Sequence, residues 1–234
     1  MTSIASHLQT VRDQIHHACA VAQRDPEQVT LLAVSKTQTP EAVAQAAAAG
    51  QRDFGENYVQ EGVEKILILR ELLPDQPLRW HCIGPLQSNK TRLVAEHFDW
   101  VQSVDRLKIA QRLSEQRPVG LAPLQVCLQV NVDGGANKSG VSPAELPALA
   151  QAVAQLPRLK LRGLMCIPEP AESVVAQRAV FDQARALFDE LNRHGLALDT
   201  LSLGMSDDLE TAIASGSTLV RVGRAIFGGR AAKV

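Results

Sequence analysis

The sequence predicts an α/β protein that forms one (β/α)8 TIM barrel with an extra helix at its N-terminus. Short apolar runs alternate along the chain with longer alanine- and leucine-rich segments of helical period, which is the pattern of strand–helix units around a parallel sheet. Eight such runs occur, and eight parallel strands close a barrel. The chain has 234 residues, a length at which such barrels form a single unit, so we expect one domain over residues 1–234.

Residues 1–25 are expected to form an amphipathic helix ahead of the first strand. Apolar side chains recur there at helical spacing, at Ile4, Leu8, Val11, Ile15, Cys19 and Ala22. Arg12, Asp13 and a pair of histidines interrupt the segment, which distinguishes it from a signal peptide. No apolar run reaches the roughly 20 residues of a membrane span, so we expect a cytoplasmic protein without a membrane partner.

The predicted strands follow one another at the spacing of a barrel. They centre on residues 30–35, 53–54, 78–83, 100–102, 124–131, 159–165, 200–203 and 218–222. Between the first two strands, Thr39 is expected to cap a helix, with Pro40 in its first helical position and Gly50 at its end.

Three later helices carry similar signals. Ser142 and Glu145 have the spacing of a capping box, which predicts that a helix begins there. A long helix is expected over residues 172–194. Ser206 is expected to be the N-cap of another helix, which ends near Gly216.

Composition and charge exclude several classes of function. The net charge is −1, with 45% hydrophobic and 21% charged residues, so no strong field would gather nucleic acid or anionic lipid. The cysteines are scattered without a CxxC pair, and we expect no disulfides. His16, His17 and Cys19 lack a further ligand at suitable spacing, so we expect no metal site.

The segment 31–37, with the sequence LLAVSKT, is an apolar strand that delivers Lys36 to its C-terminal end. Ligands of α/β proteins bind beyond the carboxyl ends of the strands, so this lysine is placed to meet a small molecule. A lysine there could form a Schiff base with an aldehyde. Taken alone, a lysine after a strand is more often an ordinary solvated loop residue.

The last two predicted strands bring a second set of polar groups to the same rim. Residues 203–208, LGMSDD, would place Ser206 at a helix N-terminus, where phosphate binds. Arg221, Gly223 and Arg224 follow the eighth strand, and barrels often bind phosphate between the loops after strands seven and eight. A capping serine and a surface arginine would explain these residues without any ligand. Together with Lys36 they favour a phosphorylated aldehyde.

Further side chains are candidates for the rim, whereas Cys82 is not. The further candidate rim residues are Asn57, His81, Ile83, Asn131, Met165 and Met205. Cys82 follows His81 within a strand, so the two side chains point to opposite faces and cannot form a nucleophile–base pair. We expect Cys82 to pack against helices. No G-x-S-x-G motif, Walker A lysine or dinucleotide fingerprint is present.

Several long motifs, in one order over essentially the whole chain, resemble the pyridoxal 5'-phosphate (PLP) homeostasis proteins of the YggS/PROSC type. These proteins share the barrel of the alanine racemase N-terminal domain, the type III fold of PLP proteins. The motifs are LLAVSKT at 31–37, FGENYVQE at 54–61, WHCIGPLQSNK at 80–90, KSG at 138–140, RGLM at 162–165, LGMSDD at 203–208 and RVGRAIFG at 221–228.

The resemblance implies roles for several residues of the rim. Lys36 would hold the cofactor covalently as an internal aldimine, and Arg221 would face the pyridine nitrogen. Ser206 and the backbone amides of Gly223 and Arg224 would bind the phosphate. Asn57 and Met205 would lie beside the cofactor. An arginine beside the ring nitrogen disfavours its protonation, so the ring would be a weak electron sink.

The chain departs from the family pattern at two positions. Arg224 stands where the family usually has serine or threonine, so its side chain either contacts the phosphate or points away. Cys82 stands where phenylalanine or methionine is usual, and the consequence is expected to be confined to packing.

Three functions are compatible with these features. The first is a non-catalytic PLP carrier that buffers the cofactor or supplies it to apo-enzymes, and so acts in vitamin B6 homeostasis and amino-acid metabolism. The second is a single-domain racemase or decarboxylase, but the chain has one tyrosine, Tyr58, and no evident second base. The third is an interaction scaffold that contacts partners through Lys138 and Lys233. Without the dimerising domain of alanine racemases, a monomer is expected.

Overall fold

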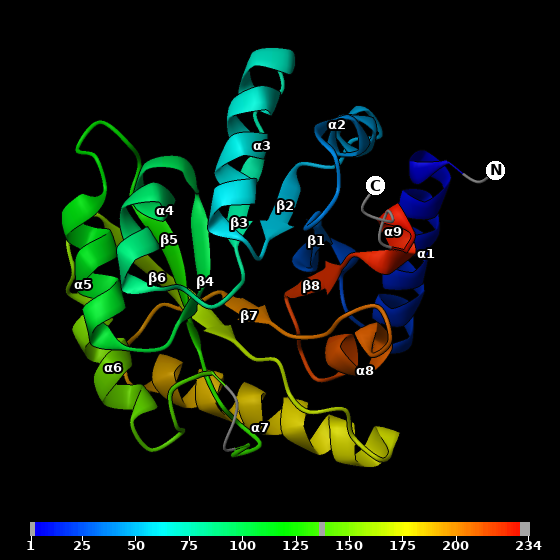
Figure 1. Ribbon diagram of the computed structural model, residues 1–234. Helices are drawn as coiled ribbons and strands as arrows, with labels where there is room; N and C mark the ends of the chain where they lie inside the picture. The colour runs from blue at the N-terminus through cyan, green and yellow to red at the C-terminus, as the bar shows by residue number, and fades with distance from the viewer. Residues whose placement is uncertain (1–2, 136–138, 230–234) are drawn as a thin grey trace.

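The computed structural model describes residues 3–135 and 139–229, and its strands form a closed parallel barrel (Figure 1). The strands pair in chain order, and the last returns to the first, with Thr30 opposite Leu219. Their bounds are β1 Thr30–Val34, β2 Asp53–Glu56, β3 Arg79–Cys82, β4 Trp100–Val104, β5 Leu124–Gln129, β6 Leu159–Met165, β7 Thr200–Ser202 and β8 Leu219–Val222. The predicted (β/α)8 fold is therefore confirmed.

Helices form the outer layer of the barrel. They are α1 Ile4–Val21, α2 Pro40–Ala48, α3 Val59–Leu72, α4 Thr91–His97, α5 Leu107–Gln116, α6 Leu146–Ala154, α7 Val174–Arg193, α8 Leu209–Ala214 and α9 Arg224–Phe227, with 3-10 turns η1 Pro26–Gln28 and η2 Ser88–Lys90. The extra N-terminal helix α1 packs on α8 and α9 near the other end of the chain (Figure 1). No helix of the described ranges has the length and apolarity needed to cross a membrane.

The cap predicted for α2 is present. The Thr39 hydroxyl accepts a hydrogen bond from the Ala42 amide at 3.3 Å, and Pro40 is the first helical residue. Gly50 follows the helix with φ of +88°, a left-handed conformation that glycine adopts without steric cost.

The helix predicted after Ser142 begins later than expected, at Leu146. Ser142 and Glu145 do form their reciprocal contacts, since the Glu145 amide donates to the Ser142 hydroxyl at 3.3 Å, but they enclose a turn ahead of the helix. Pro147 explains the difference. Proline is tolerated only in the first turn of a helix, so α6 starts immediately before it.

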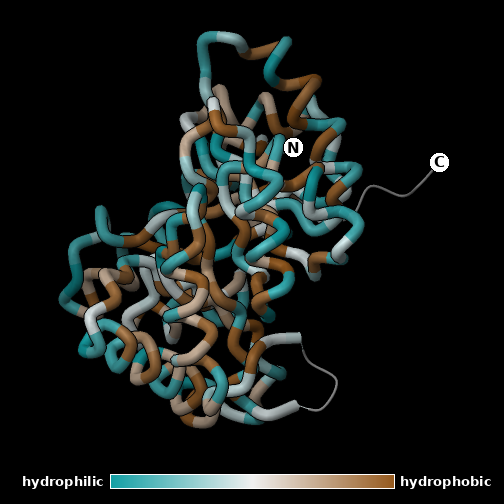
Figure 2. Tube along the Cα trace, turned by 90° about the vertical axis from the view of Figure 1, so that its left-hand side faces the viewer, coloured by the Kyte–Doolittle hydropathy of each residue, from teal (hydrophilic) through white to brown (hydrophobic). Residues whose placement is uncertain are grey.

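Alternating side chains divide the core into two regions. Phe54 and Trp80 point outward, with ring centroids 5.6 Å apart in the main core. Leu32, Ile83 and Leu219 form a small apolar cluster of their own. The tube in Figure 2 shows hydrophobic segments gathered inside and hydrophilic segments at the periphery. All four cysteines are buried, as expected for small apolar side chains.

Candidate functional site

Lys36 follows β1 and lines a cavity of about 550 Å³ at the C-terminal ends of the strands. The side chain is half-buried. Gly223, Arg224 and Gly228 line the same cavity from the loop after β8. The structure thus brings together the lysine and the last loop, which lie far apart in the sequence, because β1 and β8 are neighbours where the barrel closes.

The residues on both sides of Lys36 are held by acidic side chains. The Ser35 hydroxyl donates to Glu56 Oε1 at 2.6 Å, and the Thr37 amide donates to Glu61 Oε1 at 2.5 Å. Thr37 has φ of +64°, an uncommon conformation for a β-branched residue. These contacts fix the direction in which Lys36 leaves the strand.

A buried ion pair supports this arrangement. Lys65 Nζ lies 2.7 Å from Glu56 Oε1, 2.8 Å from the Ser35 carbonyl oxygen and 3.2 Å from Glu61 Oε1. Lys65 and Glu56 are 3% and 0% exposed. Burial raises the pKa of Glu56, although Lys65 and Ser35 act in the opposite direction. The pairing of Lys65 with Glu56 was not predicted from the sequence, in which the only local signal is the i,i+4 spacing of Lys65 with Glu61, its other partner.

The loop after β7 differs from the prediction at Ser206. Asp208, not Ser206, is the N-cap of α8. The carboxylate of Asp208 accepts a hydrogen bond from the Met205 amide, and Gly204 has φ of +88°, so residues 205–208 form a turn before the helix. Ser206 is half-buried in that turn, and its hydroxyl is not used to cap α8.

The Arg224 side chain points toward the neighbouring loop. Its guanidinium lies 3.0 Å from Asp207 Oδ2, and 79% of the side chain is exposed. The contact joins the loops after β7 and β8. An exposed pair of this kind adds little stability. Gly223 is the N-cap of α9, and the first amides of a helix have no helical acceptor.

Arg221 is buried on β8 and reaches the adjacent strand β7 and the residue that follows β6. It donates to the Ser202 hydroxyl at 2.6 Å and to the Cys166 carbonyl at 2.9 Å. Asn57 follows β2, and its Oδ1 atom is buried without a hydrogen-bond partner. Such an atom is costly unless a ligand or water satisfies it.

The remaining rim candidates have varied surroundings. Met205 is 42% exposed, whereas Met165 and Ile83 are buried. Asn131 donates to the Gly135 carbonyl at 3.0 Å, and its Oδ1 is buried without a partner. Lys138 and Lys233 lie outside the described residues.

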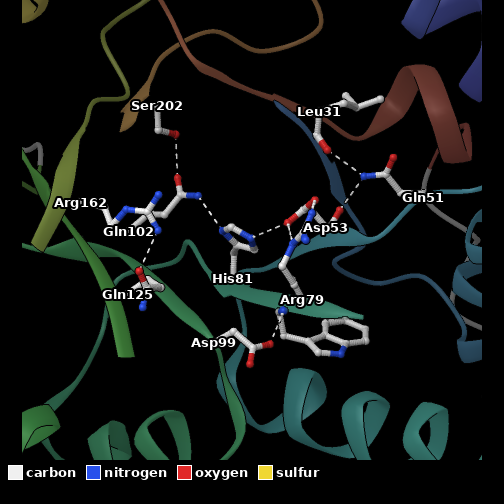
Figure 3. Close-up of polar contacts among 11 residues, drawn as sticks. Leu31, Gln51, Asp53, Arg79, His81, Asp99, Gln102, Gln125, Arg162 and Ser202 are labelled. Carbon is white, nitrogen blue, oxygen red and sulfur yellow. Dashed lines mark hydrogen bonds and ion pairs between the residues drawn. The ribbon is translucent and has the colours of Figure 1, made fainter. Parts of the chain in front are cut away.

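His81 does not lie at this rim, contrary to the prediction. Its ring is buried in the barrel, 3.2 Å from Asp53 Oδ1 and 3.0 Å from Gln102 Nε2 (Figure 3). Asp53 is the first residue of β2, so the ring is directed toward the N-terminal ends of the strands. The following residue, Cys82, is fully buried, and burial raises its pKa to about 12.

A second cavity, of about 660 Å³, opens at those N-terminal ends. Its charged groups already have partners: Arg79 binds Asp53, and Arg162 binds Asp199 at 2.7 Å. Arg117 donates to backbone carbonyls. Although this cavity is larger, the one beside Lys36 carries the reactive group and is the better candidate site.

The family described as alanine racemase, N-terminal domain, matches residues 7–231. The chain belongs to this family. A family member from Pseudomonas aeruginosa, called pyridoxal phosphate homeostasis protein, is 61% identical over 230 residues, which are 98% of this chain and 97% of the relative. The protein of the same name from Escherichia coli K12 is 57% identical over 98% of both chains. The predicted resemblance is confirmed.

Solved structures agree with the fold. PipY of Synechococcus elongatus with PLP bound has a TM-score of 0.83 and 41% identity, and the match covers 97% of this chain and all of PipY. Alanine racemase from Corynebacterium glutamicum has a TM-score of 0.69 and 19% identity, over 95% of this chain and 63% of the racemase, so it shows a shared fold only.

Proposed function

We propose that this chain binds PLP covalently through Lys36 and acts in PLP homeostasis, by buffering the cofactor or supplying it to apo-enzymes in the cytoplasm. The observation that carries the proposal is the half-buried Lys36 in a cavity shared with the loop after β8. The names of the relatives and the PLP-bound PipY structure support the same ligand.

Residues that follow the strands at this end of the barrel fit the parts of PLP, although Ser206 and Asn57 do not line the cavity itself. The Ser206 hydroxyl and the backbone amides of Gly223 and Arg224 would hold the phosphate, because an anion is favoured by N–H groups at the start of a helix. A Cβ atom at Gly223 would lie 3.2 Å from the Val34 carbonyl oxygen. Glycine therefore lets the backbone at position 223 lie close to that of β1 without crowding. The unpartnered Asn57 Oδ1 offers an acceptor to the ligand.

The chain's own residues favour holding the cofactor over catalysis. When bound, PLP supplies an aldehyde for the lysine and a ring that can withdraw electrons. Arg221 would place a positive charge beside the ring nitrogen and disfavour its protonation, which weakens that withdrawal. Tyr58 is 55% exposed, and no tyrosine other than Tyr58 occurs to act as a second base.

The other rim residues divide into two groups. Asn131, Met165, Ile83 and Met205 are proposed to line the mouth around the ligand. His81 does not contact the proposed ligand, because its ring points to the opposite end of the barrel. We further propose that a single domain over residues 1–234 functions as a monomer.

Absorbance and mass analysis test the PLP site directly. The purified protein, or the protein reconstituted with PLP, should show an absorbance band of a lysine-bound cofactor. Borohydride reduction should then leave a pyridoxyl adduct on Lys36. Lys36→Ala should abolish the adduct, whereas Lys160→Ala, an exposed lysine at the start of β6, should retain it.

Two results would contradict the proposal. One is a wild-type protein that cannot be reconstituted with PLP, and the other is an adduct on a different lysine. Conversion of L-alanine to D-alanine faster than free PLP alone would contradict the non-catalytic role and favour the racemase alternative.

A further inference from the structure

A continuous chain of side-chain hydrogen bonds runs through the interior of the barrel, and most of it is visible in Figure 3. It joins Arg221 on β8 to Asp53 on β2. The steps are Arg221 Nη1 to Ser202 Oγ at 2.6 Å, Ser202 Oγ to Gln102 Oε1 at 2.6 Å, Gln102 Nε2 to His81 Nδ1 at 3.0 Å, and His81 Nε2 to Asp53 Oδ1 at 3.2 Å.

The chemistry of Arg221 sets the direction of every bond in this chain. A guanidinium can only donate, so the Ser202 hydroxyl accepts from it and has its own proton to give to Gln102 Oε1. That orientation directs the Gln102 amide N–H to His81 Nδ1, which must be unprotonated. The His81 proton is therefore on Nε2 and is donated to Asp53.

The opposite orientation of the Gln102 amide would leave a hydroxyl proton of the chain without an acceptor. If Gln102 were flipped, its amide N–H would donate to Ser202 Oγ, and the serine proton would lose its acceptor in the chain. A neutral His81 would then present the lone pair of Nε2 to the Asp53 carboxylate. Burial also lowers the pKa of His81, although Asp53 acts in the opposite direction, and this favours the neutral ring. Its position is fixed further by stacking on Trp100, at 5.1 Å between ring centroids.

The two ends of the chain differ in their surroundings. Asp53 is anchored at the N-terminal mouth by Arg79, which donates to both carboxylate oxygens at 2.6 and 2.5 Å. Arg221 is 4% exposed, and no ion pair links it to a carboxylate among the described residues. Its side-chain contacts are the Ser202 hydroxyl and the carbonyls of Ser202 and Cys166.

We propose that Ser202, Gln102 and His81 are positioning residues for Arg221, which hold its guanidinium in the orientation that the bound cofactor requires. This inference rests on the proposed PLP site, because in that site Arg221 faces the ring nitrogen of the cofactor. Side chains inside the barrel would then orient Arg221. Among the described residues no carboxylate pairs with Arg221, so the Ser202 hydroxyl, which Gln102 holds in turn, is the side chain that fixes its guanidinium; without it, the carbonyls of Ser202 and Cys166 alone would hold the group.

Gln102→Leu tests this inference with Gln125→Leu as its matched control. Both remove a glutamine amide from a strand, but Gln125 binds Arg162 and lies off the chain (Figure 3). Gln102→Leu should weaken PLP affinity about tenfold and shift the absorption maximum of the bound cofactor, while the reduced adduct stays on Lys36. Gln125→Leu should keep the wild-type affinity within about twofold.

A measurement on the ligand-free protein separates this inference from the PLP proposal. By NMR, the Arg221 Nε–H should be rigid in wild type and Gln125→Leu and more mobile in Gln102→Leu. Ser202→Ala, which interrupts the adjacent step, should act like Gln102→Leu and replaces it if that variant does not fold. In wild type, His81 should be the Nε2–H tautomer at neutral pH.

Three results would overturn the chain as a positioning device. They are an Nδ1–H tautomer of His81, unchanged Arg221 mobility in both chain variants, and PLP affinity and absorption in those variants equal to wild type. A wild-type protein that binds no PLP would instead overturn the proposed function, while the NMR results would still decide whether the chain orders Arg221.

Discussion

Lys65 is the residue on which the geometry beside Lys36 depends most. Its ammonium group contacts Glu56, Glu61 and the Ser35 carbonyl, and it is almost fully buried. Removing one member of a buried ion pair leaves the other charge without compensation. The Lys65–Glu56 pair therefore fixes the backbone at Ser35. Truncating either side chain should destabilise the fold.

Lys65→Met is expected to lower the free energy of unfolding by about 3–5 kcal/mol, because Glu56 would keep a buried carboxylate without its cation. Urea denaturation at pH 7 measures the change. The double variant Lys65→Met/Glu56→Gln should recover part of the loss, since it removes the uncompensated charge. Equal stability of Lys65→Met and wild type would contradict the assignment of a supporting ion pair.

Asp53 should make the stability of the protein depend on pH in the acid range. Burial alone would raise the pKa of Asp53, but hydrogen bonds from Arg79 and His81 lower it to about 2. The folded-state pKa lies below the unfolded value, so the contribution is present above about pH 4 and is lost as the pH falls toward 2.

The expected size of this contribution is about 2 kcal/mol at neutral pH. Urea denaturation of wild type and Asp53→Asn between pH 7 and pH 2 measures it. The difference in unfolding free energy between the two proteins should shrink as the pH falls below about 4. A difference that stays constant across that range would show that Asp53 is not held ionised by its partners.

At the scale of the elements, sequence periodicity predicted all eight strands, while helix starts and site contacts were less predictable. The starts at Ser142 and Ser206 were misplaced because Pro147 and Asp208, just downstream, decide where the helices begin. Lys36 could be predicted since its strand delivers it directly. The direction of His81 could not, because it depends on Asp53 and Gln102 from neighbouring strands.

Pairing of β6 with β7 requires glycine at position 163. A Cβ atom built there would lie 1.6 Å from the Thr200 carbonyl oxygen, a separation that only a movement of the backbone can relieve. Gly163→Ala should lower the free energy of unfolding by about 3 kcal/mol or more. Gly120→Ala is the control, because nothing lies within 4 Å of its added Cβ. Equal urea midpoints for the two variants would contradict this packing.

At the scale of the whole molecule, the proposed ligand site lies across the closure of the barrel. Lys36 follows the first strand, whereas Ser206 and Gly223 follow the seventh and eighth. β8 pairs with β1, so a ligand held by all three residues would join the early and late parts of the chain. Binding there should stabilise the barrel as a unit, because only the folded chain brings these residues together.

Addition of PLP should therefore raise the free energy of unfolding of the whole protein. At a free concentration of 100 times Kd the increase should be about 2.7 kcal/mol, since the ligand binds the folded state only. Urea unfolding followed by circular dichroism, with and without PLP, measures it. Lys36→Ala should lose most of the increase, and Lys160→Ala should retain it. An equal increase in Lys36→Ala would mean that PLP binds the barrel without its lysine, and no increase in wild type would mean that the closure of the barrel is not the ligand site.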